Sequence, residues 1–142
     1  MGYMYHTRKT RKHYLKRMSP PGECPFCDEK IEKRTIRETK HLRIVPNLTF
    51  YDQWELTDVT DHLLILPKRH SPTLAELSKV ERAELIDLMA EYEAKGYNIH
   101  ARAPQSTSRS VVHQHTHLIK TKGKRARAAL FLQKPYIMLK IK

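Results

Sequence analysis

The chain has 142 residues, of which 39% are hydrophobic, and a formal net charge of +12 at pH 7. This length and composition predict one domain with a modest core. They exclude a membrane-spanning protein, because no apolar run approaches the length that crosses a bilayer. The two cysteines and the lack of a secretory signal favour a reduced, cytoplasmic setting over a disulfide-stabilised secreted one.

The positive charge is concentrated at the two ends of the chain. Residues 1–23 contain six Lys and Arg against one Glu, and residues 120–142 contain eight against no acid, whereas residues 24–119 have a net charge of −1. We predict a basic N-terminal arm over residues 1–22 and a single domain over 23–142 with a basic C-terminal segment. Such tails suit contact with nucleic acid, although solvated basic arms often serve only solubility.

The first motif along the chain is Cys24-Pro25-Phe26-Cys27. Two sulfurs at this spacing are typical of structural zinc sites, which take two further ligands from elsewhere. A redox pair is the alternative. A thioredoxin-type motif needs a preceding strand and a following long helix, and neither flanks this one, so metal binding is favoured.

The segment from 35 to 66 has the β-rich pattern of three short strands, near 35–45, 49–54 and 62–66. Turns are expected at Pro46-Asn47 and at 57–61. This is the pattern of an antiparallel sheet.

A helix is expected after residue 78, because Ser78 and Glu81 have the spacing of a capping box and Gly96 ends the run. Its apolar residues recur at helical spacing: Val80, Leu85, Leu88, Met89 and Tyr92. Two more strands are expected at 97–103 and 111–121. The prediction is therefore an α+β fold, with an antiparallel sheet of about five strands covered by one main helix and with basic terminal extensions.

Three of the nine histidines stand at a spacing of two in Ser110-Val111-Val112-His113-Gln114-His115-Thr116-His117. In a strand the three imidazoles share one face, because successive side chains alternate. The central His115 is the candidate nucleophile. That role needs a neutral ring with one N–H held by a backbone carbonyl, so that the other nitrogen presents a lone pair. Ser110 could hold a phosphate oxygen. The alternative is a row of half-exposed histidines at a sheet edge.

These residues resemble the signature Ser-Val-x-His-x-His-x-His of the histidine-triad (HIT) superfamily of nucleotide hydrolases and transferases. The resemblance extends to the Cys-x-x-Cys motif and to the stretch from His62 to His70, and so covers about residues 24–119. It implies a HIT-like fold and a homodimer. It also implies an enzyme that cleaves or transfers a nucleoside monophosphate at a phosphoanhydride or phosphoramidate of a nucleotide or dinucleotide, through a covalent nucleotidyl-histidine.

The resemblance also implies roles for single residues. In this family the middle histidine is the nucleophile, and the last histidine and the serine contact phosphate, which implies those roles for His115, His117 and Ser110. Zinc-binding members complete the Cys-x-x-Cys site with the first triad histidine and a histidine that follows the Ile-Pro-Lys-type strand end. The implied structural zinc ligands are Cys24, Cys27, His70 and His113, with His62 as the alternative third ligand.

The chain departs from the family at several positions. Arg102 and Arg109 stand where relatives have Asn and Gln, and both add positive charge beside the phosphate site, so both are candidate substrate-binding residues. Gln114 and Thr116 replace bulky apolar residues, which predicts a less deeply buried back of the strand. Asp52 is the nearest candidate for the family's ribose-binding acid, with a solvated turn aspartate as the alternative.

Two other functions compete with this one. The first is an enzyme that acts on nucleotidylated or capped nucleic-acid ends, and the second is a nucleic-acid-binding module without turnover. The basic tails favour both, whereas the complete triad argues against the second.

Overall fold

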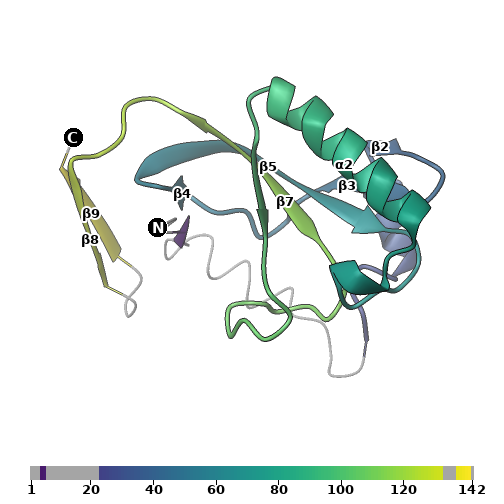
Figure 1. Ribbon diagram of the computed structural model, residues 1–142. Coiled ribbons are helices and arrows are strands. Elements are labelled where there is room, and N and C mark those ends of the chain that lie inside the picture. Colours follow the sequence, from purple (N-terminus) through teal and green to yellow (C-terminus); the bar gives the residue numbers. More distant parts are fainter. Residues whose placement is uncertain (1–3, 6–22, 133–136, 142) are drawn as a thin grey trace. The chain divides into compact units, whose positions relative to one another are not determined.

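The computed structural model describes residues 4–5, 23–132 and 137–141. Its contacts divide the chain into two compact units, of which the larger comprises Ser19–Pro46 and Leu63–Leu118 and the smaller comprises Met1–Met18, Asn47–His62 and Ile119–Lys142. The described elements are, in chain order, β1 (Met4–Tyr5), η1 (Glu29–Arg34), β2 (Arg37–Glu38), β3 (Leu42–Pro46), β4 (Gln53–Trp54), β5 (Thr57–Pro67), η2 (Leu74–Glu76), α2 (Lys79–Ala94), β6 (Asn98–Ala101), β7 (Thr116–Lys122), β8 (Ala128–Leu132) and β9 (Ile137–Ile141). This confirms the predicted α+β class with an antiparallel sheet and one main helix (Figure 1).

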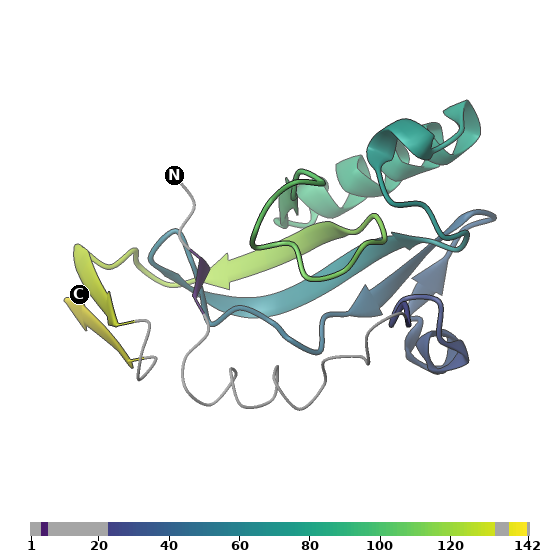
Figure 2. The same ribbon diagram turned by 90° about the horizontal axis from the view of Figure 1, so that it is seen from below.

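In the larger unit, β3 pairs antiparallel with β2 and with the second half of β5. The register sets Ile44 opposite Ile65, and Val45 opposite Leu64. Because side chains alternate along a strand, the first pair packs in a core with α2, and the second pair packs with Ile31 of η1. Figure 2 shows α2 and the η1 segment on opposite sides of these strands. Both faces of this part of the sheet are therefore covered.

Helix α2 begins at the predicted capping box. The Ser78 side chain accepts a hydrogen bond from the N–H of Glu81 at 3.2 Å, and the Glu81 carboxylate accepts one from the N–H of Ser78 at 2.7 Å. The helix ends before Gly96, whose φ of 84° suits glycine. The prediction that Val80 belongs to the buried apolar face of this helix was wrong. Val80 is 57% exposed, because the buried side chain of the first turn is that of Glu81. Among the described residues, no helix is long and apolar enough to cross a membrane.

In the smaller unit, β4 forms a hairpin with the first half of β5, and β1 pairs with β4. The turn is at Glu55 and Leu56, whose φ values are 50° and 65°. The predicted turn at 57–61 was therefore wrong, because those residues are in β5. Two-residue hairpin turns with positive φ usually contain Asn or Gly, and neither residue marks this one. Of the predicted basic arm, residues 1–3 and 6–22 lie outside the described residues.

Candidate functional site

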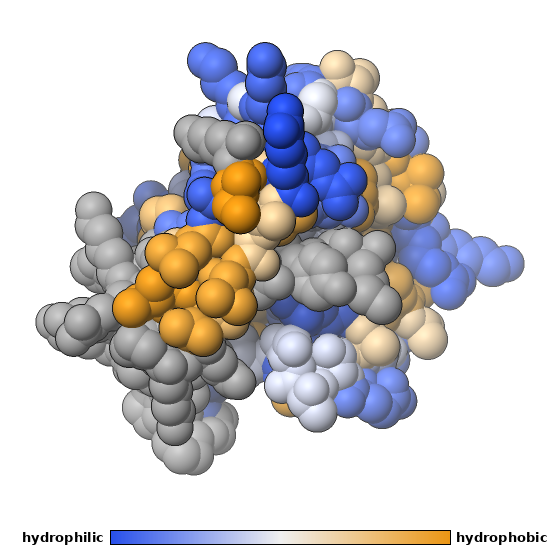
Figure 3. Space-filling model, turned by 90° about the vertical axis from the view of Figure 1, so that its left-hand side faces the viewer, coloured by the Kyte–Doolittle hydropathy of each residue, from blue (hydrophilic) through white to orange (hydrophobic). Residues whose placement is uncertain are grey.

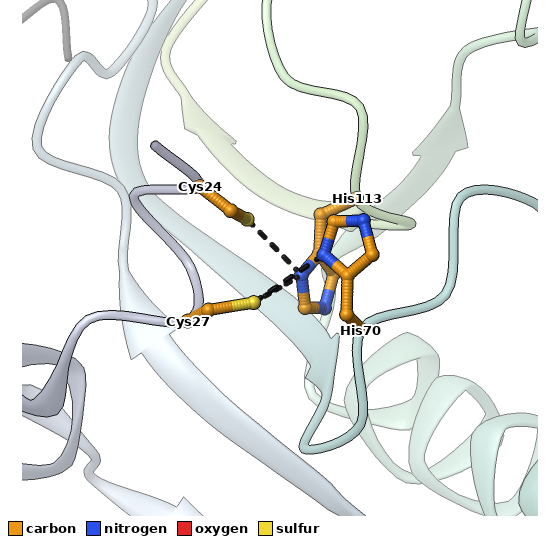
Figure 4. Close-up of side chains that lie close together, drawn as sticks. All are labelled: Cys24, Cys27, His70 and His113. Atoms are coloured by element: carbon orange, nitrogen blue, oxygen red, sulfur yellow. Dashed lines mark hydrogen bonds between the residues drawn. The ribbon is translucent and has the colours of Figure 1, made fainter. Parts of the chain in front are cut away.

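The site is built in the larger unit from three places in the chain. Cys24 and Cys27 are at the ends of a tight turn, in which the N–H of Cys27 donates to the carbonyl of Cys24 at 3.0 Å. His70 follows the end of β5, and His113 lies in a bend before β7. Figure 4 shows the four side chains pointing toward one another. The fold thus brings together the four predicted metal ligands.

The four donor atoms of this cluster lie within 4.8 Å of one another. His113 Nδ1 is 3.4 Å from Cys24 Sγ and 3.5 Å from Cys27 Sγ, and His70 Nδ1 is 3.3 Å from Cys27 Sγ. Tetrahedral zinc with ordinary Zn–S and Zn–N bonds separates sulfur and nitrogen ligands by about 3.5 Å. Two sulfurs and two imidazole nitrogens at these separations could hold a metal.

The ring of His113 is oriented for metal binding by its other nitrogen. His113 Nε2–H donates to the carbonyl of Pro67 at 3.0 Å, which leaves the lone pair on Nδ1 facing the sulfurs. The ring is fully buried. This burial lowers the pKa of His113 to about 4, although the bond to Pro67 opposes the shift and the neighbouring charges of His70, His115 and Arg109 add to it.

His62, the alternative third ligand, is not a member of the cluster. It belongs to the smaller unit, where its Nδ1 accepts a hydrogen bond from the N–H of Tyr51 at 3.1 Å and its ring packs 4.7 Å from the Tyr51 ring. His62 is therefore a packed structural histidine of β5.

His115 has the hydrogen bond that its predicted role requires. Its Nδ1–H donates to the carbonyl of His113 at 2.7 Å, so Nε2 presents the lone pair. The side chain is buried, and this burial is the main cause that lowers the pKa of His115, while the carbonyl bond opposes the shift. The nearby positive charges of Arg109 and Arg102 lower it further. A neutral imidazole is thus favoured near pH 7.

The other imidazoles continue from His115. The ring of His117 lies 5.1 Å from that of His115, and the ring of His100, on β6, lies 5.7 Å from that of His117. Phe26, inside the Cys-x-x-Cys turn, packs edge-on against His113 at 5.8 Å and His115 at 5.3 Å. The sequence analysis did not identify His100 or Phe26 as part of the site. The only signal was that His100 and Arg102 are two residues apart, which places both side chains on the same face of a strand.

Three further predicted site residues are Arg109, Ser110 and Asp52. Arg109 is half-buried, and its guanidinium donates to the backbone carbonyls of Val111, at 3.2 Å, and of Pro72. It therefore fixes the loop that leads into the histidines. Ser110 is exposed. Asp52 is in the smaller unit, and its role in ribose binding stays a prediction.

Two predictions about the histidine row were wrong. The strand does not begin at Val111 but at Thr116, because a bend precedes it and the N–H of Gln114 donates to the carbonyl of Ser71 at 2.6 Å. Nor is the back of the row poorly covered, since Gln114 is 4% exposed and Thr116 is 2% exposed. The histidines are buried as well, so the alternative of a half-exposed row does not hold.

Solved structures were compared with this fold. A HIT family protein from Bacillus anthracis matches with a TM-score of 0.56 and 19% identity, over 80% of this chain and 85% of that one. A HIT family hydrolase from Clostridium thermocellum matches with a TM-score of 0.52 and 22% identity, over 78% and 100%. One from Legionella pneumophila matches with a TM-score of 0.52 and 19% identity, over 71% and 95%.

The chain has the histidine-triad fold. The HIT-like fold expected from the signature is thereby confirmed. A scan against protein-family models found no match, and neither did a search of the curated proteins. The histidine-triad fold places the signature at the start of β7, beside the Cys-x-x-Cys turn.

Proposed function

We propose that the protein is a nucleotidyl hydrolase or transferase of the histidine-triad type. The observation that carries the proposal is the hydrogen bond from His115 Nδ1–H to the carbonyl of His113. It leaves the lone pair of Nε2 available in a buried, neutral ring, which is what a nucleophile at phosphorus needs. The solved structures titled as HIT family hydrolases have the same fold, which supports the proposal.

In the first step, Nε2 of His115 attacks the α-phosphorus of the substrate. A P–N bond forms as the bond to the leaving group breaks, and the leaving group departs with the bonding electron pair and takes up a proton. The imidazole keeps its Nδ1–H, and the carbonyl of His113 stabilises the positive charge that the ring acquires. The product of this step is a nucleotidyl-histidine.

In the second step, water or another acceptor attacks phosphorus and loses a proton. The P–N bond breaks, its electron pair returns to Nε2, and the nucleoside monophosphate is released or transferred. His117 and Ser110 would contact the phosphate oxygens. Arg109, at the end of the loop that leads into the histidines, would offset the negative charge of these oxygens. One such preorganised donor is typically worth about 3 kcal/mol in the transition state.

We also propose that the Cys24, Cys27, His70 and His113 cluster holds a structural zinc ion. Zinc would supply no step of the reaction, but its bonds would fix the segment that contains His113. The same residue presents the carbonyl to which His115 donates. Metal binding would therefore support the orientation of the nucleophile through the backbone of His113. The homodimer and the nucleic-acid contacts expected from the sequence stay predictions.

The experiment is incubation with dinucleoside polyphosphates, nucleoside phosphoramidates and adenylated oligonucleotides, with His115→Ala and Thr121→Ala as variants. We expect the mass of the wild-type protein to increase by one nucleotide. In His115→Ala this adduct should be absent, and turnover should be lower by about 10⁴-fold or more. Thr121→Ala, farther along β7, should behave as wild type. Added imidazole should restore activity to His115→Gly. Wild-type turnover by His115→Ala would refute the proposal.

A further inference from the structure

The site contains a fifth histidine, which belongs to no motif, besides His70, His113, His115 and His117. His100 is on β6, which pairs with β7, and its ring packs against that of His117 with centroids 5.7 Å apart and planes inclined by 38°. His117 in turn lies 5.1 Å from His115. The order of imidazoles is therefore His115, then His117, then His100. His100 is therefore a direct neighbour of His117, the histidine that we propose to contact phosphate.

Positive charge lies along the same part of the site. Arg102 follows His100 by two residues at the end of β6, and it interacts electrostatically with both His100 and His115. His100 itself is half-buried, and its Nε2 is shielded from solvent. A ligand that extends past His117 would meet one imidazole and one guanidinium there. Both groups can donate hydrogen bonds to phosphate oxygens.

The arrangement matters for the leaving group. A phosphate that is held by His117 and attacked by His115 has its leaving group on the side opposite the attacking nitrogen. A leaving group that is itself a phosphate brings new negative charge, whereas an amine brings none. An imidazole with an N–H in either protonation state, beside an arginine, is suited to the first and offers little to the second.

We propose that His100 and Arg102 form an anion subsite for the leaving phosphate. The preferred substrate is then a nucleoside or dinucleoside polyphosphate, and not a phosphoramidate with a neutral leaving amine. This inference rests on the proposed function and adds to it the class of substrate. The competing explanation is that His100 only packs against His117.

The experiment compares a diadenosine polyphosphate with an adenosine phosphoramidate in wild type, His100→Phe, His100→Asn and Arg102→Gln. Phe keeps a flat ring against His117 and removes the N–H, whereas Asn keeps a donor and removes the ring. Ala101→Ser, on the other face of β6, is the control and should match wild type. A lost hydrogen bond to a charged group corresponds to about 10- to 100-fold.

We expect His100→Phe and Arg102→Gln to lower kcat/KM for the polyphosphate by about 10- to 100-fold and for the phosphoramidate by about threefold or less. His100→Asn should retain more polyphosphate activity than His100→Phe. If His100→Phe equals wild type, or lowers kcat/KM equally for both substrates, His100 is a packing residue and the subsite is refuted.

Ligand binding, measured without turnover, distinguishes failure of the subsite from failure of the proposed function. If wild type turns over neither substrate, the proposed function fails, and binding of inorganic tripolyphosphate, measured by calorimetry, then decides the subsite. Affinity that falls at least about tenfold in His100→Phe and in Arg102→Gln supports the subsite. Unchanged affinity in both variants overturns it.

Discussion

The histidine site buries polar side chains, whereas the C-terminal hairpin exposes apolar ones. At the site, His113, His115 and His117 are at most 7% exposed. In the β8–β9 hairpin, aliphatic side chains face solvent, with Leu139 60% exposed and Ile141 65% exposed. Figure 3 shows a group of apolar side chains exposed on the face that it draws. Hydrophobicity alone therefore predicts burial in neither region.

The physical reason differs between the two regions. Buried imidazoles need hydrogen-bond partners, and the backbone carbonyls of Pro67 and His113 supply them to His113 and His115. The hairpin is a sheet of only two strands, in which residues opposite one another share a face. That pairing gathers its exposed aliphatic residues on a single face: Leu130, Leu132, Ile137, Leu139 and Ile141. A single hairpin has no second layer of its own to cover such a face.

The largest expected effect is metal removal at the site. Apparent zinc binding in small structural sites is worth about 10–16 kcal/mol, which rivals the roughly 5–15 kcal/mol stability of a whole domain. A strong chelator should therefore lower the Tm by about 10 °C or more, as followed by circular dichroism. The variant with Cys24→Ser and Cys27→Ser should have a low Tm that the chelator does not change. If the Tm of the wild-type protein does not change on chelation, the cluster holds no stabilising metal ion.

The next effect compares one leucine from each environment. Leu66 is fully buried in the larger unit, so Leu66→Ala should lower the free energy of unfolding by about 2–5 kcal/mol. Leu130 is 56% exposed, so Leu130→Ala should cost less than about 0.5 kcal/mol. Urea titration measures both. A cost for Leu130→Ala close to that for Leu66→Ala would show that the hairpin face is covered in solution.

A smaller effect is expected at a buried charge outside the site. The hydrogen bond from Arg69, and then that from the backbone of Ser78, lower the pKa of Glu81 to about 2. The ionised carboxylate therefore stabilises the fold above its ordinary pKa of 4.5, and this stabilisation is lost as pH falls toward 2. At pH 7, Glu81→Gln should lower the free energy of unfolding by about 1–3 kcal/mol.

Urea titration at pH 7 and pH 3 measures this dependence. The difference between wild type and Glu81→Gln should shrink at pH 3, because the carboxyl of Glu81 is then protonated in the unfolded chain but still ionised in the folded one. Glu29→Gln, at an exposed glutamate of η1, is the matched control. A difference that grows on acidification would contradict the assigned direction.

The smallest effect concerns the ion pair of the hairpin. Lys140 Nζ lies 2.6 Å from the carboxylate of Asp58 on β5. Because exposed pairs are worth about 0–1 kcal/mol, Lys140→Gln should barely change global unfolding. Hydrogen exchange should show faster exchange of the β8–β9 amides in the variant, with β3 unchanged. Equal acceleration in β3 would show that the hairpin does not open on its own.

Local signals in the sequence predicted much of this protein. The capping box of α2 joins residues three apart, and the turn of the Cys-x-x-Cys motif is also local, so neither needs distant partners. The spacing of His113, His115 and His117 predicted the candidate nucleophile, and the resemblance to the histidine-triad superfamily predicted the fold that the comparisons support. The capping box, the Cys-x-x-Cys turn and the histidine spacing all follow from residue types at short separations.

Only the tertiary structure decided which distant residues meet. His70 and not His62 faces the cysteines, because β5 ends beside the turn of Cys24 and Cys27, while His62 packs against Tyr51. His100 joins the histidine row because β6 pairs with β7. Contacts such as that between Cys27 and His113 span 86 residues, and strand pairing over such distances depends on how the whole sheet is assembled.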